Sequence, residues 1–172
     1  MSFLESSYQV LMKTAQHVSL IHVSLDLVGG ADRARDLLLK IKECGEIRSI
    51  SSVYKRYLTP ERVDLNARME FVFCFETLWG VDQCLQLTKT ADPEGRAELT
   101  MLSFDDTILM SPRLTLPYPL LHQDPLIIRC AAEAWGQYEH PIYQKSLSEM
   151  ARSAPNAKTA EFHMQGKNLV DF

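Results

Sequence analysis

The sequence predicts an α+β fold of the ferredoxin-like type, with the order βαββαβ and an antiparallel sheet that carries two helices on one face. The prediction rests on segments of alternating apolar and polar residues, typical of strands, that are interrupted by segments with helical spacing. The chain has 172 residues, of which 46% are hydrophobic, enough for one domain with its own core. We expect the domain to span residues 17–154, after an extension at 1–16 and before a tail at 155–172.

The first strand and helix are predicted between residues 17 and 45. One face of the strand is apolar, with Ile21, Val23, Leu25 and Leu27. The other face is polar, with His22, Ser24 and Asp26. After Gly29-Gly30, Asp32 is expected to cap a helix and Gly45 to end it as a left-handed cap. The spacing of the apolar positions supports this helix: Ala34, Leu37, Leu38 and Ile41.

The second half of the βαββαβ pattern follows directly. Residues 46–57 are rich in β-branched and aromatic residues and predict a second strand, which a polar loop at Thr59-Pro60 ends. Residues 68–77 alternate most clearly, with three phenylalanines on one face. A short helix over 81–89 and a fourth strand over 97–104 complete the pattern.

A C-terminal hairpin and two helices are expected to complete the domain. Asp105-Asp106 predicts a hairpin turn into residues 107–110. Asp124 followed by Pro125 is typical of a helix start, and this helix should end at Gly136. Ser146 and Glu149 form a capping-box pattern before a last short helix over 147–153. The polar tail after residue 154 is expected to be loosely ordered.

Composition narrows the class of function. The net charge of −4 and a pI of about 5.7 give no electrostatic basis for binding nucleic acid. No apolar run is long enough for a membrane span, and the N-terminal MSFLESSYQ lacks the pattern of a signal peptide. The four cysteines are scattered without a CxxC pair, which indicates reduced thiols. We therefore expect a cytoplasmic protein with neither nucleic acid nor membrane as a partner.

Several short motifs occur in the order typical of one enzyme family. They are Ser51-Ser52-Val53-Tyr54, Glu76-Thr77-Leu78, the segment 96–102, the segment Arg113-Leu114-Thr115-Leu116-Pro117-Tyr118-Pro119, and His140-Pro141. Together they make residues 19–142 resemble 6-hydroxymethyl-7,8-dihydropterin pyrophosphokinase, an enzyme of folate biosynthesis. The family's fold is the ferredoxin-like core predicted above.

The resemblance implies transfer of pyrophosphate from ATP to a pterin, with Mg²⁺ held by two aspartates on the fourth strand. Those two positions are Glu98 and Thr100 here, so only one carboxylate is left as a catalytic or metal ligand. Nucleotide-binding positions fall at Arg113, Thr115 and Tyr118.

Further departures affect the substrate positions that the resemblance implies. The family's pterin-reading asparagine falls at Glu70, and the asparagine of its glycine-serine-asparagine turn falls at Asp26. The arginine expected before the last family helix falls near Asp124, and the loop between Glu76 and Glu98 is shorter than the family's.

Alternatives stay open for these residues. Glu98 is a metal ligand or a plain exposed strand residue, and Glu70 and Glu98 share the open face of the sheet as a pair or as separate acids. Asp105-Asp106 is a displaced carboxylate pair or a turn. His22 is the one histidine placed to act, unless it is simply packed or solvated. Arg113 either binds a phosphate or has a structural role.

Two main functions are compatible with these departures. The first is a pyrophosphokinase-like protein with weak or no transfer, serving as a small-molecule binding or interaction module without a cofactor. The second is an active pyrophosphokinase that uses Mg²⁺ and ATP. A different phosphotransfer on the same scaffold is a third, weaker possibility. A pterin or nucleotide ligand or a protein partner fits the first reading.

Overall fold

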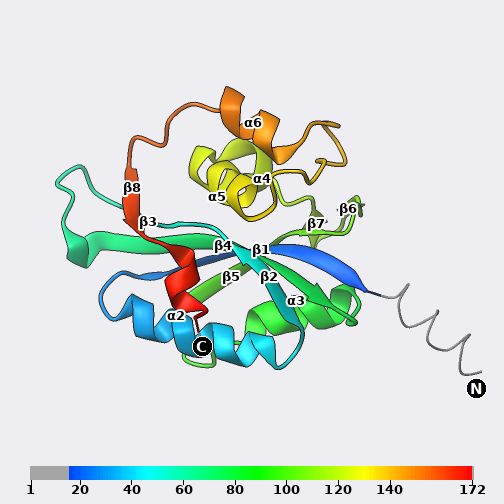
Figure 1. The fold of residues 1–172 in the computed structure, drawn as a ribbon, viewed down its shortest axis with the longest axis horizontal. Helices are drawn as coiled ribbons and strands as arrows, with labels where there is room; N and C mark the ends of the chain where they lie inside the picture. The colour runs from blue at the N-terminus through cyan, green and yellow to red at the C-terminus, as the bar shows by residue number, and fades with distance from the viewer. Residues whose placement is uncertain (1–15, 172) are drawn as a thin grey trace, which may run out of the picture.

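In the computed structural model, which describes residues 16–171, the chain forms three layers, with the main sheet between two layers of helices (Figure 1). Two helices lie below the sheet, namely α2 (Gly30–Lys42) and α3 (Val81–Thr90). Three lie above it, namely α4 (Leu120–Gln123), α5 (Pro125–Trp135) and α6 (Leu147–Ser153). Short 3₁₀ turns span Asp64–Asn66 and Gly166–Leu169.

The main sheet is antiparallel and has the order β5-β1-β4-β3-β8, with β2 paired to β4. Its strands are β1 (His17–Asp26), β2 (Glu46–Ile50), β3 (Val53–Tyr57), β4 (Ala67–Thr77), β5 (Ala97–Phe104) and β8 (Ala160–Met164). The predicted α+β, ferredoxin-like class is confirmed. The single strand expected over 46–57 is instead two strands, β2 and β3. Ser51 and Ser52 lie between them, and both strands pair with β4.

Both predicted caps of α2 are wrong. The helix begins one residue after Gly29, which takes the left-handed conformation with φ of 71°, so Asp32 lies in the first turn and pairs with Arg35 at 3.0 Å. Gly45 has no positive φ. A Cβ there would lie 2.4 Å from the carbonyl oxygen of Glu76, so glycine serves the close approach of the chain to β4.

The caps of α5 and α6 are confirmed. Asp124 accepts hydrogen bonds from the backbone N–H groups of Leu126 and Ile127, and Pro125 occupies the first turn. Ser146 and Glu149 form the predicted capping box of α6. These caps depend on contacts within a few residues, which is why local sequence predicts them well.

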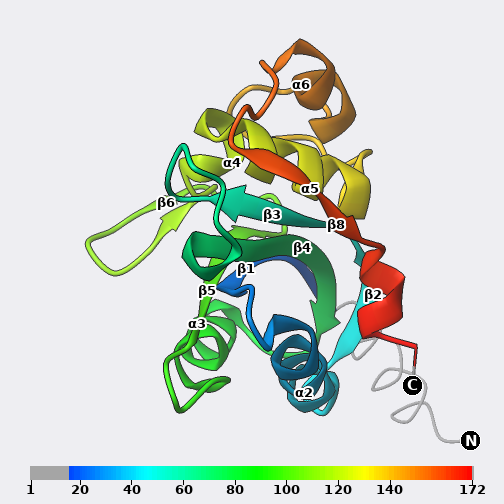
Figure 2. The same cartoon turned by 90° about the vertical axis from the view of Figure 1, so that its left-hand side faces the viewer.

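The C-terminal segment is part of the sheet, in contrast to the loosely ordered tail expected after residue 154. β8 pairs with β3 along one edge, as Figure 2 shows, and the 3₁₀ turn that follows places Leu169 in the core. Gly166 lies so close to Ser51 that any side chain there would collide with its carbonyl oxygen. Of the extension expected at 1–16, residues 1–15 lie outside the described residues.

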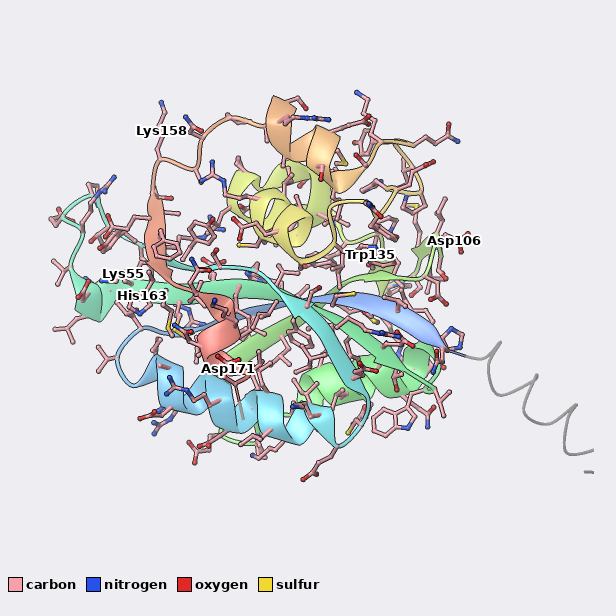
Figure 3. All side chains as sticks on the ribbon, viewed as in Figure 1. Lys55, Asp106, Trp135, Lys158, His163 and Asp171 are labelled. Carbon is pink, nitrogen blue, oxygen red and sulfur yellow. The ribbon has the colours of Figure 1, made fainter. Side chains whose placement is uncertain are left out.

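The hairpin expected at Asp105-Asp106 is wrong in its pairing. Strand β6 (Leu109–Met110) pairs with β7 (Thr115–Leu116) in a separate two-stranded sheet and not with β5. Asp105 turns the chain away, because its backbone N–H donates to Val18 and its carboxylate accepts from the backbone of Val18 and contacts His17. Figure 3 places Asp106 near this small hairpin, far from Lys55 and His163 at the other end.

Two hydrophobic clusters lie on opposite faces of the sheet. The lower cluster packs against α2 and α3, and its largest members include Ile21, Leu38, Met69, Phe71, Phe73 and Phe75. The upper cluster packs against α5, and its members include Leu20, Val72, Leu102, Leu121, Ile127 and Ala131. The strict alternation of β1 and β4 produces both clusters, because neighbouring residues point to opposite faces. The face of the sheet opposite α2 and α3 is therefore covered by the C-terminal third of the chain.

Candidate functional site

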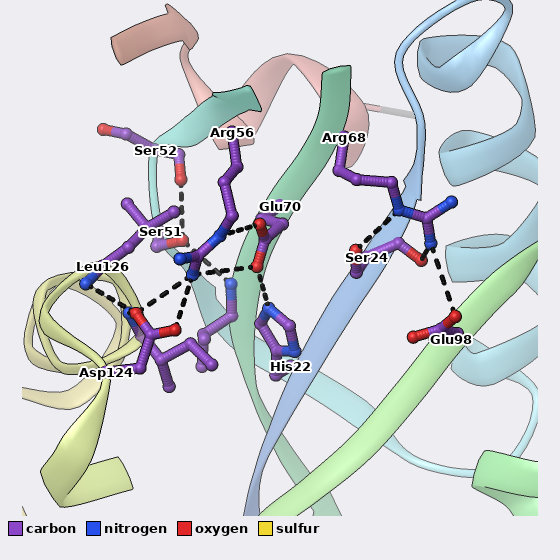
Figure 4. Close-up of polar contacts among 12 residues, drawn as sticks. His22, Ser24, Ser51, Ser52, Arg56, Arg68, Glu70, Glu98, Asp124 and Leu126 are labelled. Atoms are coloured by element: carbon purple, nitrogen blue, oxygen red, sulfur yellow. Dashed lines mark hydrogen bonds and ion pairs between the residues drawn. The ribbon is translucent and has the colours of Figure 1, made fainter. Parts of the chain in front are cut away.

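Polar side chains gather on the upper face of the sheet, where β1, β4 and β3 pass beneath the first turn of α5 (Figure 4). Four of them form a continuous chain: His22, Glu70, Arg56 and Asp124. We call these four residues the ion-pair chain. They come from β1, β4, β3 and the start of α5, so only the folded chain brings them together.

The contacts of the ion-pair chain are short and largely shielded from water. His22 Nε2 donates to Glu70 Oε1 at 2.8 Å, and their side chains are 8% and 5% exposed. Arg56 donates to Glu70 through Nε, and through Nη2 at 3.3 Å. The same Nη2 donates to both carboxylate oxygens of Asp124, at 3.0 and 2.9 Å.

Strand register and a helix cap position these side chains. Glu70 is opposite Ser24 on β1 and opposite Tyr54 on β3. Two residues beyond Tyr54, Arg56 leaves the same face of β3 and reaches across to Glu70. Asp124 is fixed by its role as N-cap of α5, where the helix dipole favours a negative charge.

Two carboxylates, of Glu70 and Asp124, share one guanidinium in the ion-pair chain. Burial alone would raise the pKa of Glu70, but hydrogen bonds from His22 and Arg56 outweigh it and hold that pKa below its ordinary value. Burial would lower the pKa of Arg56, whereas its bonds to Glu70 and Asp124 raise that pKa overall. Glu70 is thus ionised at neutral pH, and Arg56 donates its hydrogen bonds to the carboxylates of Glu70 and Asp124.

A second polar group surrounds Arg68 at the edge of the same face. Arg68 donates to the hydroxyl of Ser24 at 3.0 Å, to the carbonyl of Ser24 at 2.8 Å and to Asp26 at 2.8 Å. Its Nη2 lies 3.9 Å from Glu98 Oε1. The side chains of Asp26 and Glu98 are 64% and 79% exposed, so both acids are mainly solvated.

The predicted acids share a face but do not form a pair. Glu70 and Glu98 both align with Ser24, from opposite sides of β1. The backbones of the two acids are therefore two strand spacings apart, about 10 Å, and their carboxylates have different partners: Glu70 bonds His22 and Arg56, whereas Glu98 lies beside Arg68. Thr100 is opposite His22 on β1. Within residues 16–171, no three side chains of the histidine, cysteine, aspartate and glutamate types form a group suited to a metal ion.

The predicted nucleotide residues lie on and after the β6–β7 hairpin. Arg113 is exposed and makes no hydrogen bond or ion pair with any residue of 16–171. Thr115 belongs to β7, opposite Met110. Tyr118 packs partly buried against the upper cluster, and its backbone N–H donates to Leu102.

Arg56 is the central residue that the sequence analysis missed. It follows the Ser51-Ser52-Val53-Tyr54 motif in a stretch with two adjacent basic residues, and nothing local distinguishes it from its neighbour Lys55. Its importance comes from facing Glu70 across the sheet and Asp124 across the layers. A register between β3 and β4 would have been needed to predict the first contact.

Comparison with known proteins places the fold. No family model matches the chain, and no curated protein matches it. Solved structures of the wild-type HPPK-DHPS protein of Plasmodium falciparum are similar to it. The form with pterin and p-hydroxybenzoate has a TM-score of 0.64 at 8% identity, covering 80% of this chain and 41% of that chain. The form with SDX-DHP gives 0.62 at 9% identity, covering 80% and 44%.

The likeness confirms the resemblance at the level of the fold. The chain spans less than half the length of these solved chains, and its fold is HPPK-like. At such low identity the fold alone is shown, and the chemistry has to be argued from the residues. Across residues 16–171, moreover, every helix is too short or too polar to cross a bilayer.

Proposed function

We propose that this protein uses a pyrophosphokinase-like scaffold as a binding or interaction module and does not catalyse efficient pyrophosphoryl transfer. One observation carries the proposal: Arg56 forms ion pairs with both Glu70 and Asp124. The resemblance assigns the first of these acids to pterin recognition, and it places an arginine before the last family helix near the second. An internal ion pair that occupies both positions leaves fewer groups for a pterin and a nucleotide.

The metal position supports the same proposal. Glu98 is 79% exposed and lies 3.9 Å from the guanidinium of Arg68, and Thr100 supplies a hydroxyl where the family has a second carboxylate. Mg²⁺ requires nearly ideal octahedral oxygen ligands and is usually held by carboxylates together with substrate phosphates. One solvated carboxylate beside a cation is a weak ligand for such an ion.

Product formation tests the proposal directly. The protein is incubated with ATP, Mg²⁺ and 6-hydroxymethyl-7,8-dihydropterin, and AMP is measured against a sample without protein. We expect no AMP above that background from protein whose folding is verified by circular dichroism. Magnesium-dependent AMP that disappears in Glu98→Gln would overturn the proposal.

An active pyrophosphokinase is the alternative, and Arg113 favours it. This arginine is exposed and has no partner among residues 16–171, so its guanidinium is accessible to a phosphate. Calorimetric titration with ATP, in the wild type and in Arg113→Met, separates the two functions when combined with the AMP assay. ATP binding that needs Arg113 without AMP formation fits a binding module, whereas AMP formation establishes the alternative.

The ligand of the module can be sought among the family's substrates and among proteins. One similar HPPK-DHPS structure was solved with pterin, which makes pterin the first ligand to try. Thermal unfolding with and without pterins and ATP measures binding, because a ligand that binds only the folded state raises Tm. If neither raises Tm and no protein co-purifies, the binding function is wrong.

A further inference from the structure

A cavity between α5, α6 and the loop that joins them has features that the proposed function does not use. Its volume is about 340 Å³, within the range of small-molecule sites. Half of the residues that line it are apolar, among them Pro125, Ile128, Met150 and Pro155. We call it the α5–α6 cavity.

Polar groups at the α5–α6 cavity are donors or neutral, and no acidic residue is among those that line it. Lys145 lines it with an ammonium group that has no ion pair within residues 16–171. His122 and Tyr143 also line it. Three other cavities of the described residues differ. One is lined by acids and bases together, one by an Arg56 that is already paired, and one by the Glu43, Glu46 and Glu76 side chains.

Behind this wall lies a fully buried histidine with an unused polar atom. His140 is 0% exposed, and its ring centroid is 5.3 Å from that of His122 and 5.0 Å from that of Tyr143. Its Nε2 has no hydrogen-bond partner within the described residues, and neither has Nδ1 of His122. Buried polar atoms without partners are uncommon in folded proteins and call for an explanation.

The hydrogen bonds of His140 determine which nitrogen carries its proton. Nδ1 accepts from the backbone N–H groups of Ile142 and Tyr143, at 3.3 and 3.4 Å. In a neutral ring the proton must then be on Nε2, which is a buried donor without an acceptor. Burial, with a smaller effect of His122, lowers the pKa of His140 to about 4, so the ring is neutral at pH 7.

This protonation argues against a metal ion as the missing partner. A metal binds the unprotonated nitrogen of a neutral imidazole, and Nε2 keeps its proton as long as Nδ1 accepts from the backbone. The partner that suits the Nε2–H of His140 is instead a hydrogen-bond acceptor. An anionic oxygen satisfies both the N–H donor and the ammonium of Lys145.

We propose that the α5–α6 cavity binds a small carboxylate with an apolar body. The carboxylate oxygens accept from Lys145 at the mouth and from His140 Nε2, and the apolar body packs on Ile128 and Met150. Tyr143 covers His140, and its side chain is on the exposed loop, with 51% of its surface accessible. His140 itself does not line the cavity, so the proposal includes a movement of the Tyr143 ring that brings Nε2 within reach of the carboxylate.

Benzoate is the probe, with two controls that each lack one feature. Benzamide has the same ring without the charge, and acetate has the charge without the apolar body. We expect benzoate to bind the full chain with a Kd in the millimolar range, as befits so small a ligand, and to raise Tm. Benzamide and acetate at the same concentration should bind at least about tenfold more weakly, because each loses one of the two contributions.

Variants and NMR locate the binding. Lys145→Met should weaken benzoate binding about tenfold, whereas Lys89→Met, an exposed lysine on α3, removes the same charge without effect. Histidine side-chain ¹H–¹⁵N spectra should show a downfield shift of the His140 Nε2–H proton on binding. The proposal is wrong if benzamide binds as well as benzoate, if Lys145→Met binds normally, or if the His140 resonance is unchanged at saturation. These outcomes do not involve AMP formation, so they are independent of the proposed function.

Discussion

The two faces of the sheet are built from the same strands but are stabilised by different interactions. Below the sheet, β1 and β4 present mainly apolar side chains to α2 and α3, and these form one continuous cluster. Above it, an apolar cluster under α5 borders directly on the ion-pair chain of His22, Glu70, Arg56 and Asp124. The lower face therefore depends on shape and burial, which many sequences satisfy, and the upper face on partners that must all be present.

The largest effect is expected from the lower face. Phe73→Ala should destabilise the protein by about 4 kcal/mol, because it removes a fully buried ring and leaves a cavity among packed side chains. Urea unfolding measures the change. The matched control Phe162→Ala alters an edge-strand ring that is 54% exposed and should cost less than about 1 kcal/mol. Equal costs for the two variants would contradict the packing described for this face.

Breaking the ion-pair chain should have the second largest effect. Arg56→Met should destabilise by about 3 kcal/mol, because Glu70 stays buried without its guanidinium partner. Arg62→Met removes an exposed ion pair with Glu161 and should cost about 0.5 kcal/mol or less. Adding Glu70→Gln to Arg56→Met should recover part of the loss, since the buried charge is then gone. No recovery would mean that packing of the arginine, and not its charge, stabilises this face.

Acidification should weaken the upper layer next. The pKa of His140 falls from the ordinary 6.5 to about 4 in the folded state, so the unfolded chain binds this proton first as the pH drops. Its contribution is present above pH 6.5 and is lost toward pH 4, by about 2 kcal/mol between pH 7 and pH 5. Urea unfolding across this range, compared with His140→Gln, measures it. An equally steep pH dependence in the variant would assign the effect to other groups.

Fluorescence can assign that loss to a face. Trp79 contacts the lower cluster and Trp135 the upper one, so Trp79→Phe and Trp135→Phe each leave a reporter for one layer. We expect the Trp135 signal to change at a higher pH than the Trp79 signal. Coincident transitions would show that the two layers unfold as one cooperative unit.

The smallest effect is expected at Thr100, the position that the resemblance assigns to a second metal ligand. Thr100→Asp restores a second acid two residues from Glu98 but should change the free energy of unfolding by no more than about 0.5 kcal/mol, because the site is partly exposed. The variant should still release no AMP, since Arg56 continues to occupy Glu70 and Asp124. AMP formation by Thr100→Asp would show that a second carboxylate beside Glu98 is enough for catalysis.

The regular parts of the fold could be predicted because their signals are local. The alternation in β4, the spacing of Ala34, Leu37 and Ile41 in α2, and the cap at Asp124 each involve residues a few positions apart. The predictions that were wrong concern residues whose conformation depends on backbone that is distant in the sequence. Gly45 is fixed by its approach to Glu76, and β8 is ordered because β3 offers it an open edge.

The sequence by itself determined the fold class, the two faces of each strand and the presence of a hydroxyl at Thr100, where the resemblance implies a second metal carboxylate. Only the tertiary structure decided what the polar residues do. The strand alternation places Glu70 and Glu98 on one face of the sheet. In the structure, however, Ser24 of β1 lies between them and Glu70 forms an ion pair with Arg56. The physical reason is that strand period fixes the direction of a side chain, whereas partners depend on register and on which helix covers the sheet.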